Sequence, residues 1–331
     1  MKDILNYLFE HKTLSKHDAK AALMAITKGD VNFAQTAAFC TVYRMRSITV
    51  EELEGFRDAM LELCLHVDLG EVDAIDVCGT GGDGKNTFNI STITTFVAAG
   101  AGVKVAKHGN YAVSSSVGSS NVLEHVGIKF TNDIALLRNC MDASGIAIMH
   151  APLFHPAMKN VAPIRKELGV KTFFNILGPI VNPSFPSKQM VGVYSLELAR
   201  LYAYLYQHSS KRFLVIHSVD GYDEISLTGN FKMITDVSEK LVSPEDIGRR
   251  KLFAEEIYGG NSIEESAKIF MNILKGKGTD AQNEVVMANA GMAIYCANPS
   301  MSIFDAQEKA KESLLSGKAL KSFEALKKVL G

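Results

Sequence analysis

The sequence predicts an α/β protein, with a small helical N-terminal domain followed by a larger α/β domain whose mostly parallel central sheet is flanked by helices. Two observations support this fold class. Residues 1 to about 70 show only helical periodicity, whereas short apolar runs alternate with helix-like segments from residue 74 onward. That alternation is typical of parallel strands joined by helices that cover the sheet. A chain of 331 residues is long enough for both domains.

The N-terminal helices are predicted from their start signals. Ser15 with Asp18 resembles a capping box, and Thr49 with Glu52 makes a second one. Each is followed by apolar residues at helical spacing. We therefore expect a helical domain at residues 1–70 and an α/β domain at residues 71–331.

The α/β domain is predicted from compact runs of branched apolar residues. Five such runs, at 74–78, 103–106, 146–149, 190–193 and 213–216, read as strands. Helical periodicity occupies 91–101, 118–126, 133–143 and 196–208 between them, and three helices are expected from residue 262 onward. Five of the eight prolines lie between Pro156 and Pro186. A crossing segment near 160–186 is therefore expected to interrupt this domain and join it to the helical one.

Composition excludes several classes of protein. A net charge of −1 argues against a non-specific nucleic-acid or membrane-surface binder. The five scattered cysteines form no CxxC pair, so neither a disulfide framework nor a zinc site is indicated. No apolar run approaches the roughly 20 residues of a membrane span, and the N-terminus is unlike a signal peptide. The expected location is the cytoplasm.

The glycine-rich run at residues 79–84 follows the first predicted strand. It matches the dinucleotide pattern GxGxxG, but the next strand ends in Lys107 and His108 instead of the required acidic residue. It also nearly matches a P-loop, but Asn86 replaces the metal-binding Ser or Thr. A turn without a ligand is the third alternative, yet three glycines in four positions exceed what a turn requires. An anion-binding loop that leads into a helix is favoured.

Two further loops follow strand ends. Lys107, His108, Gly109 and Asn110 precede a hydroxyl-rich stretch, so this second loop could reach the same anion. After the strand at 212–217, an adjacent Asp223–Glu224 pair suits Mg²⁺, which uses one or two carboxylates plus substrate phosphates. Alone, the first pattern could be a solvated turn and the second a surface acidic turn. Their positions at strand ends beside the glycine loop favour binding.

The ordered set of motifs resembles the anthranilate phosphoribosyltransferase family. The set comprises GTGGD at 79–83, NIST at 89–92, KHGN at 107–110, HPAMK at 155–159, RKELG at 165–169, NILGP at 175–179 and Asp223–Glu224. The resemblance implies a fold like that of nucleoside phosphorylases and phosphoribosyltransferases. It also implies an enzyme that transfers phosphoribosyl from phosphoribosyl pyrophosphate (PRPP) to anthranilate, releasing pyrophosphate, in tryptophan biosynthesis. It further implies a homodimer joined through the helical domain; whether an anthranilate synthase partner binds is left open.

The resemblance assigns site residues by motif. Magnesium, at two ions per subunit, would be held by Ser91, Asp223 and Glu224. Anthranilate would contact Gly79, Asn110 and Arg165, whose planar guanidinium suits a carboxylate, and His155 and Pro152 would line its access route. No general acid or base is assigned, and Lys107 would act electrostatically. PRPP would be surrounded by Gly79, Gly82, Asp83, Thr87, Asn89, Ile90, Ser91, Thr92, Lys107, His108, Gly109, Asn110, Tyr111, Ala112, Val113, Ser114, Ser115 and Ser119.

Two alternatives remain at this point. A pyrimidine nucleoside phosphorylase-like enzyme would use inorganic phosphate and would need no acidic metal pair. A non-catalytic relative that binds nucleic acid would show a basic groove and eroded PRPP motifs. Tyr111 departs from the basic residue expected after KHGN, which matters little if its side chain points away from the ligand.

Overall fold

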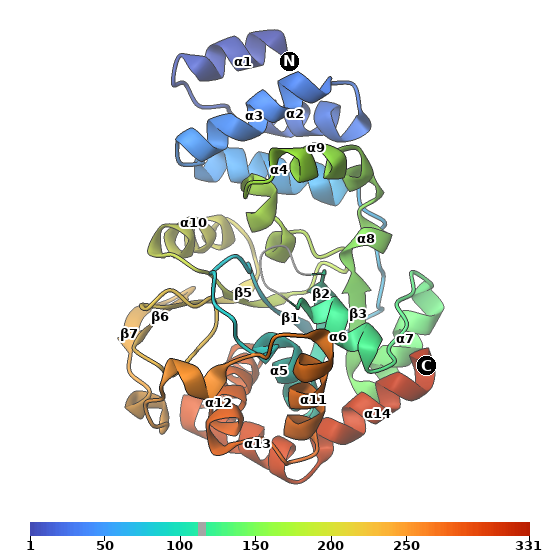
Figure 1. The fold of residues 1–331 in the computed structure, drawn as a ribbon, viewed down its shortest axis with the longest axis vertical. Coiled ribbons are helices and arrows are strands. Elements are labelled where there is room, and N and C mark those ends of the chain that lie inside the picture. The colour runs from blue at the N-terminus through green and yellow to red at the C-terminus, as the bar shows by residue number, and fades with distance from the viewer. Residues whose placement is uncertain (112–116) are drawn as a thin grey trace. The chain divides into compact units, whose positions relative to one another are not determined.

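The computed structural model describes residues 1–111 and 117–331 (Figure 1). The chain forms two compact units. One comprises Met1–His66 with Ala151–Pro183, and the other comprises Val67–His150 with Ser184–Gly331. Each unit is therefore built from two separate stretches of sequence. Among the described residues, no helix combines the length and the hydropathy that crossing a membrane requires.

The first unit is entirely helical. Its start signals act as the sequence predicts: Ser15 accepts a hydrogen bond from the Asp18 N–H at 3.1 Å, and Thr49 with Glu52 forms a reciprocal capping box. Its α-helices are α1 (Lys2–Phe9), α2 (Lys16–Lys28), α3 (Phe33–Met45), α4 (Val50–Glu62), α8 (Ala151–Phe154) and α9 (Ala162–Leu168). Single 3₁₀ turns span Pro156–Asn160, Phe173–Ile176 and Gly178–Ile180.

A buried glutamate and an aromatic cluster hold the helical unit together. Phe56 stacks on Phe173 at 4.6 Å, and Tyr43 meets both rings edge-on. The Glu52 carboxylate is fully buried and accepts hydrogen bonds from Arg46 and from the Leu14 N–H, each at 2.9 Å. Burial alone would raise the pKa of Glu52, but these donors hold that pKa below its ordinary value.

The second unit contains one seven-stranded sheet in the order β3-β2-β1-β4-β5-β6-β7. Its first five strands are parallel and occupy the five predicted positions, whereas β6 and β7 are antiparallel additions that the sequence did not predict. The mostly parallel fold class is confirmed. The strands are β1 (Ala74–Gly79), β2 (Lys104–Gly109), β3 (Ile146–His150), β4 (Lys188–Gly192), β5 (Arg212–Ser218), β6 (Phe231–Thr235) and β7 (Glu239–Val242).

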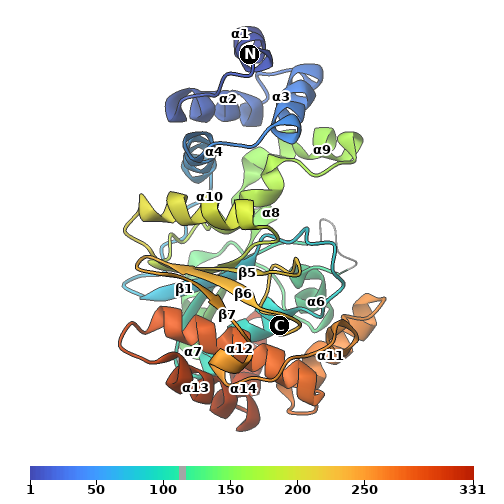
Figure 2. The same ribbon diagram turned by 90° about the vertical axis from the view of Figure 1, so that its left-hand side faces the viewer.

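Helices cover both faces of this sheet. Figure 2 shows α10 on one face and the C-terminal helices on the other. The prediction of three C-terminal helices was wrong, because left-handed glycines at 276 and 317 and the Asn298–Pro299 break divide the segment into four. The helices are α5 (Ile90–Gly100), α6 (Ser119–His125), α7 (Ile134–Ser144), α10 (Leu196–Gln207), α11 (Ile263–Leu274), α12 (Asp280–Ala297), α13 (Ile303–Leu315) and α14 (Lys318–Leu330), with 3₁₀ turns at Glu245–Ile247 and Ala254–Ile257.

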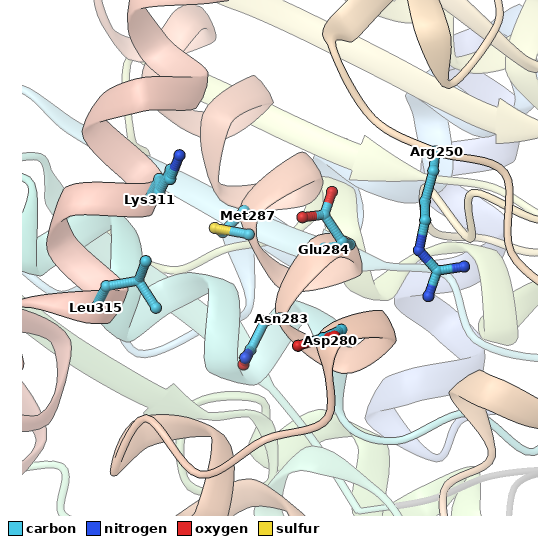
Figure 3. A pocket seen from close by; sticks show the side chains of 7 residues that line it. All are labelled: Arg250, Asp280, Asn283, Glu284, Met287, Lys311 and Leu315. Atoms are coloured by element: carbon cyan, nitrogen blue, oxygen red, sulfur yellow. The ribbon is translucent and has the colours of Figure 1, made fainter.

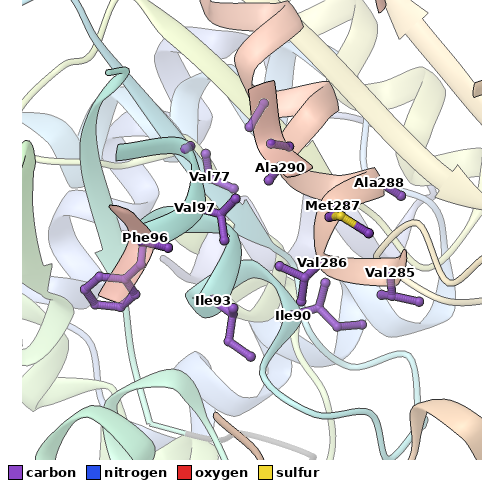
Figure 4. Close-up of a cluster of buried hydrophobic side chains, with 14 of the residues drawn as sticks. Val77, Ile90, Ile93, Phe96, Val97, Val285, Val286, Met287, Ala288 and Ala290 are labelled. Carbon is purple, nitrogen blue, oxygen red and sulfur yellow. The ribbon is translucent and has the colours of Figure 1, made fainter. Parts of the chain in front are cut away.

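The core of this unit lies where α5 and α12 pack against each other and against β1. Figure 4 shows Ile93 and Val97 of α5 near Val286 and Ala290 of α12, all completely buried. From β1 the strand order runs one way through β2 to β3 and the other way through β4 to β5. Ligands of open α/β sheets bind outside the carboxyl ends of the strands, where such an order reverses. A ligand site is therefore expected at the loops that follow β1, β2 and β5.

Candidate active site

The loop after β1 is built from glycines in backbone conformations that other residues rarely adopt. Gly81, Gly82 and Gly84 have φ values of 65°, 81° and 73°. The left-handed region costs a residue with a Cβ about 1 kcal/mol or more, and glycine escapes that cost. The loop leads through Asn89, the N-cap residue, into α5. Backbone N–H groups of a glycine loop and of a helix N-terminus are suited to an anion.

The acidic pair reaches this loop. The Gly81 N–H donates to Asp223 Oδ2 at 2.6 Å, and the Ser91 N–H at the start of α5 donates to Glu224 Oε1 at 3.2 Å. The two contacts join residues more than 130 positions apart in the chain. The loops after β1 and β5 therefore meet at one place, although β4 separates the two strands in the sheet.

The two carboxyls are electrostatically unfavourable as anions in the free protein. Burial raises the pKa of Asp223 well above its ordinary value, and the charges of Glu224 and Asp83 raise it further. Burial also raises the pKa of Glu224 to about 7, against the lowering effect of Lys107 and the Ser91 N–H. A bound cation would compensate these charges. The two carboxylates and the Ser91 hydroxyl provide the oxygen ligands that magnesium prefers. The residues present fit that ion.

Lys107 lies closer to the sheet than the sequence suggested. Its side chain is 2% exposed, and its ammonium group donates to the Val77 carbonyl oxygen of β1 at 2.7 Å. Its positive charge acts on Glu224, whose pKa it lowers. The structure thus brings a positive charge held by the sheet close enough to act on the acidic pair.

The second loop follows β2, whose last residues are His108 and Gly109, and it begins with Asn110. The His108 N–H donates to Asp76 at 3.2 Å, and Ser119 donates to the Asn110 carbonyl oxygen at 3.1 Å, which ties the loop to the start of α6. Tyr111 packs edge-on against His150, and its hydroxyl donates to Glu124 of α6 at 2.9 Å. The predicted residues Ala112, Val113, Ser114 and Ser115 lie outside the described residues.

The remaining predicted PRPP residues lie in the glycine loop or directly after it. Asp83 accepts a hydrogen bond from the Lys85 N–H at 3.0 Å, and Thr87 forms an isolated β-bridge with Tyr258. The side chains of Ile90 and Thr92 are buried in α5. Only the backbone of these two residues can therefore meet a ligand at the loop.

The predicted residues Pro152, His155 and Arg165 belong to the helical unit. Arg165 is half-buried and lies over the Phe174 ring, with its guanidinium carbon 5.4 Å from the ring centre. It donates to Asn175 at 3.4 Å, and burial lowers its pKa. None of the described carboxylates forms an ion pair with Arg165. Its expected contact with anthranilate stays a prediction.

Three residues that sequence reasoning missed support the acidic pair. Gly192 ends β4 beneath Asp223, Ser218 ends β5 and donates to the Glu224 carbonyl oxygen at 2.6 Å, and Asn289 of α12 bonds to Ile225. Two signals could have indicated them. A glycine inside a strand pattern often marks a close backbone approach, and Asn289 is the one amide in the otherwise apolar stretch at residues 285–297.

A separate hollow of about 490 Å³ lies against α12 and α13, and Figure 3 shows its lining side chains. Two of its four charged side chains form ion pairs with residues outside the lining: Glu284 with Arg249 at 3.3 Å, and Arg250 with Glu256 at 3.0 Å. No predicted site residue lines this hollow. The strand-end loops are therefore the better candidate.

Comparisons with known proteins agree with this architecture. The glycosyl transferase family α/β domain matches residues 71–320, and the helical bundle domain of that family matches residues 2–64. The chain therefore belongs to this family of glycosyl transferases, which combines the two domains.

The particular family within that class follows from individual relatives. An anthranilate phosphoribosyltransferase from Flavobacterium psychrophilum is 60% identical over 329 residues, which covers 99% of each chain. The crystal structure of the Thermus thermophilus anthranilate phosphoribosyltransferase superimposes with a TM-score of 0.92 at 31% identity, covering 98% of both chains. The Saccharomyces cerevisiae enzyme, solved in complex with PRPP and Mg, gives 0.91 at 28% identity and covers 98% and 96%. The chain belongs to the anthranilate phosphoribosyltransferase family, and the predicted resemblance is confirmed.

Proposed function

We propose that this chain transfers the phosphoribosyl group of PRPP to the amino group of anthranilate, giving N-(5-phosphoribosyl)anthranilate and pyrophosphate in tryptophan biosynthesis. The family assignment supports this activity. The main structural support is that Asp223 and Glu224 accept hydrogen bonds from the glycine loop and from the start of α5. This arrangement brings anion-binding N–H groups and magnesium-binding carboxylates to one point.

PRPP is bound by the residues around the first two loops. The backbone N–H groups at Gly82 and at the start of α5 receive its pyrophosphate, and the helix dipole adds favourable charge. The sequence extends the same site through Asp83, Thr87 and Asn89 on one side and through Lys107–Ser115 and Ser119 on the other. Fixed donors of this kind stabilise the charge that develops on the departing pyrophosphate.

Magnesium is held by Ser91, Asp223 and Glu224, with two ions per subunit. The Mg in the yeast complex supports the identity of the metal. Among the described residues, no group of three His, Cys, Asp or Glu side chains could hold a metal by itself. The substrate's phosphates would therefore complete the coordination, as is usual for magnesium. When bound, the metal neutralises charge on the leaving group.

Anthranilate is bound by Gly79, Asn110 and Arg165, with His155 and Pro152 along its access route. Arg165 suits the substrate carboxylate because its planar guanidinium can donate two parallel hydrogen bonds. The arylamine is neutral at pH 7, so it can attack the sugar carbon without a general base. Positioning of the amine and exclusion of water are then the tasks left to the protein.

The enzyme acts as a cytoplasmic homodimer joined through its helical unit. Large apolar side chains on α1 and α3 support this proposal, because Phe9, Phe33 and Met45 are 57%, 55% and 83% exposed. All five cysteines are free and buried, as expected in a reducing compartment. Sedimentation velocity measures the oligomeric state, and a monomer would contradict this part of the proposal.

A fluorescence assay tests the activity directly. The chain is mixed with PRPP, Mg²⁺ and anthranilate, and loss of anthranilate fluorescence is followed together with pyrophosphate release. Reactions without Mg²⁺ or without PRPP are the controls, and both should be inactive. Phosphorolysis of a nucleoside without magnesium would instead favour a phosphorylase. Salt-dependent DNA binding with no PRPP turnover would favour a nucleic-acid-binding relative.

A further inference from the structure

Asn289 is a completely buried amide in the apolar stretch of a helix, at residues 285–297. It lies in α12, and its neighbours Ala288 and Ala290 belong to the hydrophobic core (Figure 4). A buried amide costs stability unless its donors and acceptor are satisfied. Its hydrogen bonds therefore indicate why an amide occupies this position.

All of those hydrogen bonds go to backbone groups, and two go to one residue of the acidic loop. Asn289 Oδ1 accepts from the Ile225 N–H at 3.0 Å, and Nδ2 donates to the Ile225 carbonyl oxygen at 2.9 Å. Nδ2 also donates to the Val285 carbonyl oxygen of its own helix at 2.9 Å. The amide thus holds both sides of Ile225, the residue that directly follows Glu224.

A second tether holds the same loop from the sheet. Ser218 at the end of β5 donates to the Glu224 carbonyl oxygen at 2.6 Å. The backbone on both sides of the Glu224–Ile225 peptide bond is therefore attached to rigid elements, α12 and β5. The carboxylates themselves bond to the Gly81 and Ser91 N–H groups.

These tethers hold the loop in a position that is unfavourable for its side chains. Asp223 is buried and Glu224 is half-buried, and removal from water disfavours a carboxyl group that lacks compensating partners. Loss of Asn289 would leave the Ile225 N–H and carbonyl groups without partners in the interior, which a shift of the loop toward water would relieve. Such a shift would move the carboxylates away from the start of α5.

We propose that Asn289 is a positioning residue that holds Asp223 and Glu224 in the geometry that binds magnesium together with PRPP. This inference rests on the proposed function. Asn289 acts through the loop backbone and contacts no substrate. Its role differs from general stabilisation of the fold because it is directed at the metal-binding step.

Two matched variants test the proposal. Asn289→Leu removes the amide and keeps the number and branching of the side-chain heavy atoms. Gln307→Met is the control, because Gln307 is also buried and also bonds to α12, at the Ala288 carbonyl oxygen 3.2 Å away, but touches no part of the 218–226 loop in any described hydrogen bond. Ser218→Ala, which removes the other tether with little change in volume, keeps the test available if Asn289→Leu does not fold.

The readouts are thermal melting, binding of Mn²⁺ in the presence of PRPP followed by electron paramagnetic resonance, and the Mg²⁺ dependence of turnover. All three variants should melt at a lower temperature than the wild type. Asn289→Leu and Ser218→Ala should weaken Mn²⁺ binding about tenfold or more, as loss of an outer-shell partner does. They should also need correspondingly more Mg²⁺ for turnover and regain most of kcat when it is saturating, whereas Gln307→Met should bind Mn²⁺ as the wild type does.

Wild-type Mn²⁺ binding by Asn289→Leu, or an equal loss in Gln307→Met, would overturn the positioning role while leaving the proposed function intact. A wild-type chain that neither binds Mn²⁺ with PRPP nor turns PRPP over would overturn the proposed function, and this inference with it.

Discussion

Gly192→Ala probes the point at which the acidic loop crosses the sheet. Gly192 is the last residue of β4 and pairs with Gly79 of β1. The backbone of Asp223 passes directly over it on the way from β5 to the glycine loop. Gly192 does not have a left-handed φ, so an alanine here would be disfavoured only by steric overlap with its neighbours.

The size of the clash follows from the structure. A Cβ added at Gly192 would lie 2.5 Å from the carbonyl carbon of Asp223 and closer still to its oxygen. Carbon atoms in contact normally lie about 3.5 to 4.0 Å apart, so the loop must move by about 1 Å or more. Overpacking of this kind costs about 1 to 3 kcal/mol of stability. A displacement of about 1 Å at groups that position a substrate can lower the rate about 100-fold.

The assay compares kcat/KM for PRPP at several Mg²⁺ concentrations, using the loss of anthranilate fluorescence. Gly192→Ala should lose about 100-fold in kcat/KM and require more Mg²⁺. Gly229→Ala is the control, because Gly229 lies near the same loop but its added Cβ would meet Asp220 at an ordinary 3.6 Å. If the Gly192→Ala enzyme kept wild-type kcat/KM and Mg²⁺ dependence, the close approach of the Asp223 backbone would not be the reason why position 192 is a glycine.

Three further outcomes are expected. Replacing Asp223 by Asn or Glu224 by Gln should reduce turnover at least 100-fold, and an unchanged rate in the fluorescence assay would refute their role as metal ligands. Arg165→Ala should raise KM for anthranilate about tenfold or more while changing KM for PRPP little; steady-state kinetics that show equal losses for both substrates would contradict its assigned partner. Glu52→Gln should destabilise the protein by about 3 kcal/mol at neutral pH, because Arg46 loses its buried partner. Folding lowers the pKa of Glu52, so its stabilisation exists above the unfolded value of about 4.3 and is lost as the pH falls through the lower folded pKa. Thermal melts should therefore show a stability difference that shrinks in acid, and a difference independent of pH would count against the ion pair.

Local patterns in the sequence were sufficient for most of the fold. Each parallel strand is a short apolar run, and this signal is strong because both faces of a parallel strand are buried. Lys232 interrupts the apolar residues of β6, and β7 is largely exposed at the edge of the sheet, so neither strand forms a continuous apolar run. The position of these two strands in the sheet depends on the pairing of β6 with β5, and no local sequence pattern predicts that pairing.

The sequence by itself determined which chemical groups this protein carries at its strand ends: a loop of glycines, a lysine-containing loop and an acidic pair. The residues within each of these groups are neighbours in the chain, so each pattern is visible without a structure. Only the tertiary structure decided that the acidic pair meets the glycine loop across β4, that the Lys107 ammonium group bonds to the backbone of β1, and that Asn289 holds the acidic loop. These are contacts between residues 30 to 142 positions apart. These contacts depend on the order of the strands in the sheet and on the space that Gly192 leaves for the Asp223 backbone. No local sequence pattern predicts either of them.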